Sequence, residues 1–124
     1  MESPNKKKIL LADDDASMRR LLEVILRKAD FEVVPAEDGL QAMKLAFEEE
    51  ISAIVADAIM PNLTGFELCR MIKSKADKRD VPVIILSGLE GNSGEAEKCN
   101  ADAYLTKTPK LTEELIETLK NLIS

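Results

Sequence analysis

Ile51-Ser-Ala-Ile-Val-Ala-Asp57-Ala-Ile-Met-Pro-Asn-Leu-Thr-Gly65 is the stretch from which the fold can be read. Residues 51–56 carry no charge and no apolar stripe of helical period, which predicts a strand buried on both faces. Asp57 follows at its carboxyl end, where open parallel sheets gather ligands, and Pro61 and Asn62 then turn a loop that Gly65 closes. A lone aspartate here could equally be a helix cap or a turn residue, so its role depends on the rest of the chain.

Short apolar runs and amphipathic repeats alternate along the rest of the sequence. Four further strands are expected at residues 9–12, 31–34, 83–86 and 102–106. Five helices are expected over residues 18–29, 39–50, from 64 onwards, about 93–99 and 111–123. This alternation with short connections predicts parallel crossovers and an α/β fold, a three-layer sandwich around a five-stranded parallel sheet.

Two of the expected helices have a clear apolar face, and several residues indicate where helices begin or end. The first face comprises Met18, Leu21, Leu22, Ile25, Leu26 and Ala29, and the second comprises Leu40, Met43, Ala46 and Phe47. Thr64 and Glu67 have the spacing of a capping box, and Asn100 suits the left-handed conformation that ends a helix. Cys69 is expected to be a small core residue of the helix that starts at Thr64.

The composition excludes several classes of protein. The 124 residues suit one domain, and no apolar run approaches the roughly 20 residues of a membrane span. With no histidine and only Cys69 and Cys99, a structural zinc site and a disulfide framework are not expected. A net charge of −6 argues against nonspecific binding to nucleic-acid phosphates. The amino terminus lacks the apolar core of a secretory signal, which favours a cytoplasmic location.

Polar side chains collect at the carboxyl ends of the expected strands. They are Asp13, Asp14, Asp57, Ser87 and Lys107. Because parallel strands end at one edge of the sheet, these side chains can converge, and the carboxylates among them would repel one another. A magnesium ion would hold them, and the ion, the ammonium and the hydroxyl together would suit a dianionic phosphoryl group. The nearest nucleophile is then a carboxylate, so phosphorylation of an aspartate is the hypothesis.

Each of these residues also has an ordinary structural interpretation. Asp13, Asp14 or Asp15 could cap the first helix, and for Asp15 this is the favoured interpretation. Ser87 could be a turn hydroxyl, and Lys107 could be a solvated surface charge. It is their joint occurrence at strand ends that favours a common site.

Four motifs in this order resemble the receiver domain of bacterial two-component response regulators, of the chemotaxis type. They are Ile9-Leu-Leu-Ala-Asp-Asp-Asp15 with Met18-Arg-Arg20, Asp57-Ala-Ile-Met-Pro-Asn-Leu-Thr-Gly65, Val81-Pro-Val-Ile-Ile-Leu-Ser-Gly88 and Ala101-Asp-Ala-Tyr-Leu-Thr-Lys107. The resemblance implies a single receiver domain over residues 1–124, with its core at about 6–123. It also implies the flavodoxin-like strand order 2-1-3-4-5.

The resemblance further implies a phosphoryl acceptor and a magnesium site. Asp57 would accept the phosphoryl group from a phosphohistidine of a sensor kinase or phosphotransfer protein. Asp14 and Asp57 would ligate Mg²⁺ directly, Asp13 would act through water, and the backbone carbonyl of Ile59 would be a further ligand. Such a chain is not an enzyme for other substrates, because it catalyses only its own phosphorylation and dephosphorylation.

A switch is implied as well. Lys107 would pair with a phosphoryl oxygen, and Ser87 would turn inward to hydrogen-bond the group. The space that Ser87 vacates would let Tyr104 move inward, which reshapes the face offered to a downstream protein or fused output domain. Neither direct nucleic-acid binding nor membrane binding is expected of this domain.

The sequence departs from the family pattern at several places. Thr108 stands between Lys107 and Pro109, where the family has proline directly after its lysine, often through a cis bond; a cis bond before Thr108 would cost about 3 kcal/mol. This loop could therefore aim Lys107 differently. Asp30 stands where glycine is common, and residues 90–94 are glycine-rich before a shortened fourth helix. Ile59 and Leu89 are both apolar, and we hypothesise that they orient no attacking water, so that the acyl phosphate is long-lived.

Two other functions compete with a phosphorylation switch. Asp13-x-Asp15-x-Ser17 resembles the nucleophile loop of haloacid-dehalogenase-type phosphatases, but no aspartate follows Lys107 to complete such a site. A phosphorylation-independent interaction module with a receiver fold is the second alternative, motivated by the altered Lys107 loop and the short fourth helix.

Overall fold

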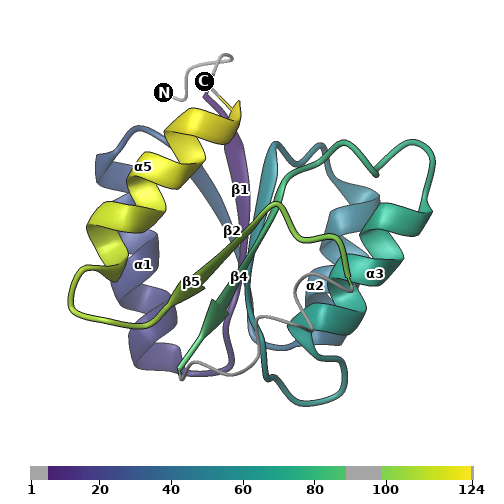
Figure 1. Ribbon diagram of the computed structural model, residues 1–124, viewed down its shortest axis with the longest axis horizontal. Coiled ribbons are helices and arrows are strands. Elements are labelled where there is room, and N and C mark those ends of the chain that lie inside the picture. The colour runs from purple at the N-terminus through teal and green to yellow at the C-terminus, as the bar shows by residue number, and fades with distance from the viewer. Residues whose placement is uncertain (1–5, 89–98, 124) are drawn as a thin grey trace.

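The computed structural model describes residues 6–88 and 99–123, which form a parallel sheet between two layers of helices (Figure 1). Its elements in chain order are β1 (Lys8–Ala12), α1 (Ala16–Lys28), β2 (Glu32–Ala36), α2 (Gly39–Glu48), β3 (Ala53–Asp57), α3 (Gly65–Ser74), β4 (Val83–Ser87), β5 (Ala103–Thr106) and α5 (Leu111–Ile123). The expected fourth helix, about 93–99, lies outside the described residues except for Cys99. The other four expected helices are present.

The five strands pair in parallel in the order β2-β1-β3-β4-β5, as the resemblance implied. The chain starts at β1, moves to the β2 edge, and then crosses back through β3 to the β5 edge. This reversal separates the two helix layers: α1 and α5 cover one face, and α2 and α3 cover the other (Figure 1). The three-layer α/β sandwich is therefore confirmed.

β3 is buried on both faces, as its lack of charge predicted. Ile54 and Ala56 pack in the core on the α2/α3 side, whereas Ala53 and Val55 pack in the core on the α1/α5 side. The strand begins at Ala53, two residues later than expected, and it includes Asp57, which is opposite Leu86 of β4. Asp57 is therefore the last residue of the strand, which gives its backbone the rigidity of the sheet.

The helix-start signals at Asp15 and Thr64 are confirmed, whereas the helix that Asn100 was expected to end lies outside the described residues. Asp15 caps α1 by accepting hydrogen bonds from two backbone N–H groups, and the Thr64–Glu67 capping box closes at 3.1 and 2.9 Å. Asn100 has a positive φ of 65°, and Asp30, where glycine is common, has a φ of 73°. For a non-glycine residue this conformation is a mild strain.

Two predictions about the helix faces are wrong. Leu21 of α1 and Leu40 of α2 are 49% and 48% exposed, whereas the buried residues are Leu22 and Leu26 in α1 and Gly39, Ala42 and Ala46 in α2. Cys69 is fully buried, as expected, and its thiol donates a hydrogen bond to the backbone carbonyl of Cys99 at 3.1 Å.

Candidate functional site

The turn after β1 places Asp13 inside the protein and Asp14 at its surface. Asp13 is wholly buried, and its Oδ1 accepts a hydrogen bond from the backbone N–H of Asp15 at 2.9 Å. Asp15 uses its own carboxylate to cap α1, with its Oδ1 2.9 Å from the N–H of Ser17. The three consecutive aspartates thus differ in role: Asp13 and Asp14 can belong to the site, whereas Asp15 caps α1.

The loop after β3 folds back tightly on Asp57. Gly65 donates its N–H to the carbonyl of Ala58 at 2.9 Å, and Ala58 donates to Leu86 at 2.7 Å. A Cβ atom on Gly65 would collide with the backbone carbonyl of Asp57, so only glycine permits this close approach. The motif glycine therefore fixes the backbone that presents the Asp57 carboxylate.

Lys107 connects the two buried carboxylates. Its Nζ lies 3.0 Å from Oδ2 of Asp57 and 3.4 Å from Oδ2 of Asp13. Its backbone N–H donates to the carbonyl of Ser87 at 2.7 Å, which extends the pairing of β4 and β5 by one residue. Thr108 does not turn the lysine away, and every peptide bond among the described residues is trans.

Burial and charge shift two of these groups. Burial raises the pKa of Asp13 above its ordinary value, while the hydrogen bond from Asp15 and the charge of Lys107 oppose this effect. For Lys107, burial lowers the pKa, but the hydrogen bond to Asp57 and the charges of Asp13 and Asp57 outweigh it and raise the pKa overall. The raised pKa of Lys107 shows that its ammonium form is stabilised by the two buried carboxylates beside it.

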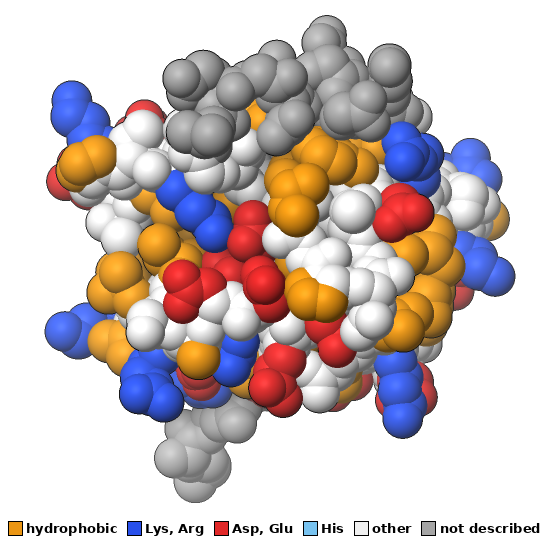
Figure 2. Space-filling view, turned by 90° about the horizontal axis from the view of Figure 1, so that it is seen from below, with side chains coloured by type: hydrophobic (Ala, Val, Ile, Leu, Met, Phe, Trp, Pro, Cys, Tyr) orange, Lys and Arg blue, Asp and Glu red, His pale blue; other side chains and the backbone are white. Residues whose placement is uncertain are grey.

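The carboxylates of Asp13, Asp14 and Asp57 fit a divalent cation. One oxygen from each lies within 4.8 Å of the others, and all three come from the carboxyl ends of neighbouring strands. Figure 2 shows acidic side chains gathered in the middle of this edge of the molecule. A hard cation with oxygen ligands, such as Mg²⁺, is the ion that this donor set prefers.

The remaining predicted site residues lie around this cluster. Ser87 is the last residue of β4 and is 2% exposed. Tyr104 of β5 packs against the core on the α2/α3 side, and its hydroxyl is buried with no hydrogen-bond partner among the described residues. Ile59 points its side chain outward, with 62% exposure. The roles assigned to Ser87, Tyr104 and the Ile59 carbonyl stay predictions, and Leu89 lies outside the described residues.

One contact to the site was not predicted. Arg19 of α1 donates from Nη1 to the backbone carbonyl of Asp13 at 2.6 Å. It belongs to the Met18-Arg-Arg20 motif. Its partner is a backbone carbonyl, which every residue has, so no acidic partner in the sequence marks the contact. Only its distance from Asp15, one helical turn, could have pointed to it.

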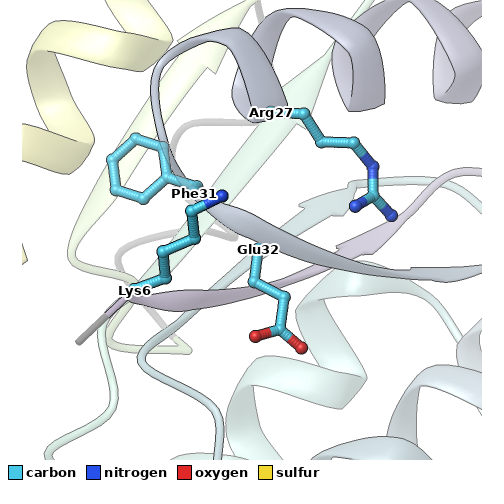
Figure 3. A pocket seen from close by; sticks show the side chains of 4 residues that line it. All are labelled: Lys6, Arg27, Phe31 and Glu32. Carbon is cyan, nitrogen blue, oxygen red and sulfur yellow. The ribbon is translucent and has the colours of Figure 1, made fainter. Parts of the chain in front are cut away.

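A separate hollow lies at the opposite edge of the sheet, where β1 and β2 begin (Figure 3). It measures about 170 Å³ and is lined by Lys6, Arg27, Phe31 and Glu32. Arg27 pairs with Glu23 at 2.8 Å and Lys6 pairs with Asp30 at 3.6 Å. Because both cations already have anionic partners, we assign this hollow no part in the site. None of the helices in the described ranges is long and apolar enough to cross a membrane.

Comparison with known proteins identifies similar sequences and structures. A family model of the response regulator receiver domain matches residues 9–120. A probable transcriptional regulator of Cyanophora paradoxa, ycf27, is 36% identical over 119 residues, which cover 93% of this chain and 48% of that protein. Protein PilG of Pseudomonas aeruginosa is 33% identical over 115 residues, which cover 91% of this chain and 84% of PilG.

A solved structure of similar fold contains a metal. The receiver domain of a sensor histidine kinase from Pseudomonas aeruginosa, with a magnesium ion coordinated in its active-site cleft, superposes with a TM-score of 0.87. It is 30% identical, and the match covers 95% of this chain and 98% of that one. The chain spans about half the length of several transcriptional regulators that it matches. It belongs to the family of response regulator receiver domains.

Proposed function

We propose that Asp57 is the phosphoryl acceptor of this receiver domain. The observation that carries the proposal is the grouping of Asp57 with Asp13 and Asp14 within 4.8 Å, beside the ammonium of Lys107. In the reaction, an oxygen of Asp57 attacks phosphorus, the new P–O bond forms, and the P–N bond to the donor imidazole breaks. A dianionic group beside clustered carboxylates needs positive charge, which Lys107 and a bound cation would supply.

Asp13, Asp14, Asp57 and the backbone carbonyl of Ile59 would hold Mg²⁺. When bound, the ion supplies charge that neutralises the carboxylates and the incoming phosphoryl oxygens. The magnesium in the similar receiver domain from Pseudomonas aeruginosa supports this choice of metal. Lys107 contacts both buried carboxylates and would turn its Nζ to a phosphoryl oxygen once the group is attached to Asp57.

The phosphoryl donor would be a phosphohistidine of a sensor kinase or phosphotransfer protein. The signal would leave through Ser87 and Tyr104, by a hydrogen bond from the serine hydroxyl and an inward shift of the tyrosine ring. The receiver of the signal would be a downstream protein or a fused output domain. The lengths of the transcriptional regulators that the chain matches support a fused partner, and PilG, which the chain covers over 84% of its length, supports a separate one.

Phosphorylation by a small-molecule donor tests the proposal directly. The protein is incubated with phosphoramidate and Mg²⁺, and its intact mass is measured. We expect the wild type to gain one phosphoryl group and Asp57→Asn to gain none. Asp38→Asn is the matched control, because Asp38 is a half-buried helix cap that asparagine can replace. A wild type that stays unmodified would favour the phosphorylation-independent module.

Turnover of a chromogenic phosphate monoester separates the switch from a phosphatase. We expect no turnover beyond the background of Asp57→Asn, since the chain is proposed to act only on its own phosphoryl group. Sustained turnover that depends on Asp13 or Asp15 would instead support the haloacid-dehalogenase-like alternative.

A further inference from the structure

Arg19 contacts the candidate metal site through the backbone of one of its aspartates. The half-buried side chain reaches from α1 to the carbonyl oxygen of Asp13 at 2.6 Å. Several carboxylates lie nearby, yet none of those in the described ranges forms an ion pair with this guanidinium. A charge-assisted hydrogen bond to a carbonyl is about twice as strong as a neutral one, so the contact is well suited to hold a backbone in place.

Asp13 is held at four points, and Arg19 supplies one of them. Its N–H donates to Ala36 at 3.2 Å, its Oδ1 accepts from Asp15 at 2.9 Å, and its Oδ2 lies 3.4 Å from Lys107. The fourth point is the carbonyl oxygen, which sheet pairing does not hold because β1 ends at Ala12. Without Arg19, the carbonyl oxygen of Asp13 would have no hydrogen-bond donor among the described residues and would bind solvent.

The carbonyl of Asp13 belongs to the peptide unit that joins Asp13 to Asp14. A peptide unit is planar, so fixing its oxygen also fixes the direction in which the chain enters Asp14. Asp14 is exposed, and its place near Asp13 and Asp57 depends on this backbone. The geometry of α1 favours the contact, because helical side chains lean toward the amino terminus and Arg19 lies one turn beyond Asp15.

We propose that Arg19 is a positioning residue that orients the Asp13–Asp14 peptide and so brings two carboxylates into register with Asp57. This inference rests on the proposed function, because it concerns the same cation site. Arg19 touches neither the phosphoryl group nor the ion in this role. Partners of metal-binding residues that act in this way are worth roughly 10- to 100-fold in metal affinity.

The charge of Arg19 and its hydrogen bond act in opposite directions on a cation. A nearby positive charge repels Mg²⁺, so loss of the charge alone would tighten binding or leave it unchanged. Loss of the hydrogen bond would weaken binding, because the two carboxylates would no longer be held together. Arg20 provides the matched control: it is the next residue of α1, carries the same charge, and is exposed.

The test is a titration of the full chain with MgCl₂, followed by amide chemical shifts, for the wild type, Arg19→Gln, Arg19→Lys and Arg20→Gln. We expect about tenfold weaker Mg²⁺ binding in Arg19→Gln, a smaller loss in Arg19→Lys, and no loss in Arg20→Gln. A metal-free measurement accompanies it: amide exchange of Asp15, whose N–H binds Asp13, should be faster in Arg19→Gln alone. Melting in EDTA shows whether each variant is folded.

Equal Mg²⁺ affinity and equal Asp15 exchange in Arg19→Gln and Arg20→Gln would overturn the positioning role. If Arg19→Gln does not fold, Arg19→Lys decides, and wild-type affinity together with wild-type exchange in that variant counts against the proposal. A wild type that binds no Mg²⁺ would instead contradict the proposed function itself, and the inference with it. The two failures are therefore distinguishable.

Discussion

The ammonium of Lys107 lies 3.0 Å from Asp57, and the two residues come from strands that are separated by β4. The lysine side chain must therefore cross the end of β4 to reach the aspartate, and it contacts Asp13 at 3.4 Å on the far side. This one side chain supplies the positive charge at the centre of the candidate site. Removing this ammonium group should slow phosphorylation of Asp57 more than it changes the free energy of unfolding.

We expect Lys107→Met to slow phosphorylation from phosphoramidate by roughly 10²-fold, the scale seen when one electrostatic contact to a developing anion is removed. Initial rates of mass gain measure the effect at saturating Mg²⁺. Lys110→Met is the control, because Lys110 is an exposed lysine three residues later. Rates within twofold of one another in the two variants would contradict the role given to Lys107.

The buried carboxylate of Asp13 predicts a distinct pH dependence in metal-free protein. Burial raises the pKa of Asp13 above 3.8, so the native state holds this proton more tightly than the unfolded chain does. The corresponding stabilisation is present below pH 3.8 and is lost as the pH rises through the folded-state pKa. In EDTA, we expect Asp13→Asn to raise the free energy of unfolding at pH 7, and the gain to vanish toward pH 3.8.

Urea denaturation across this pH range measures the difference between Asp13→Asn and the wild type. Asp38→Asn again serves as the control, and it should show no such gain. Addition of Mg²⁺ should stabilise the wild type and not Asp13→Asn, which reverses their order. A gain that does not change with pH would show that repacking, and not the buried charge, is responsible.

Gly65→Ala should destabilise the fold by about 1–3 kcal/mol, the usual cost of forcing atoms into a packed site. The new methyl group meets the backbone carbonyl of Asp57, so the variant should also bind Mg²⁺ more weakly. Gly88→Ala is a matched control, because a Cβ atom at Gly88 meets no atom of the described residues within 4 Å. Urea denaturation of both variants checks the prediction. Equal stabilities would show that the loop after β3 shifts to accommodate the methyl group.

The outward side chain of Ile59 makes the lifetime hypothesis accessible to experiment. We expect Ile59→Asn to shorten the half-life of the phosphorylated protein, because an amide can orient an attacking water. The change should stay below roughly 10²-fold, the lower limit for a positioned proton-transfer group. Leu40→Asn is a suitable control, since Leu40 is also an exposed apolar residue, 48% against 62% for Ile59. Unchanged half-lives in both Ile59→Asn and Leu89→Glu would contradict the hypothesis that these apolar residues make the acyl phosphate long-lived.

The parallel sheet and the acidic cluster were predictable because they follow from simple rules, whereas the strand order came from the family resemblance. Strands without charge must be buried, parallel strands end at one edge, and Asp13, Asp14, Asp57 and Lys107 each stand at or just beyond such an end. Residue type alone is then informative, because carboxylates that meet at one edge need a cation. The capping residues Asp15 and Thr64 were predictable for a similar reason, since their partners are local backbone groups.

Other features depend on distances that a pattern does not contain. Leu21 and Leu40 belong to apolar faces in the sequence but are about half exposed, because burial depends on how each helix is rotated on the sheet. Arg19 binds a carbonyl, a group that every residue possesses, so no pair of residue types marks the contact. The direction of the Lys107 side chain likewise depends on backbone geometry, which residue types alone do not specify.

The hydrogen bond from the backbone of Lys107 to the carbonyl of Ser87 also bears on how this site can vary among relatives. The starting point of the lysine side chain is set by the spacing of two adjacent strands and owes little to the identity of the residue that follows it. Position 108 can therefore carry a residue other than the proline that the family pattern places after the lysine. Sequence searches that demand a lysine–proline pair would overlook members of the family such as this one.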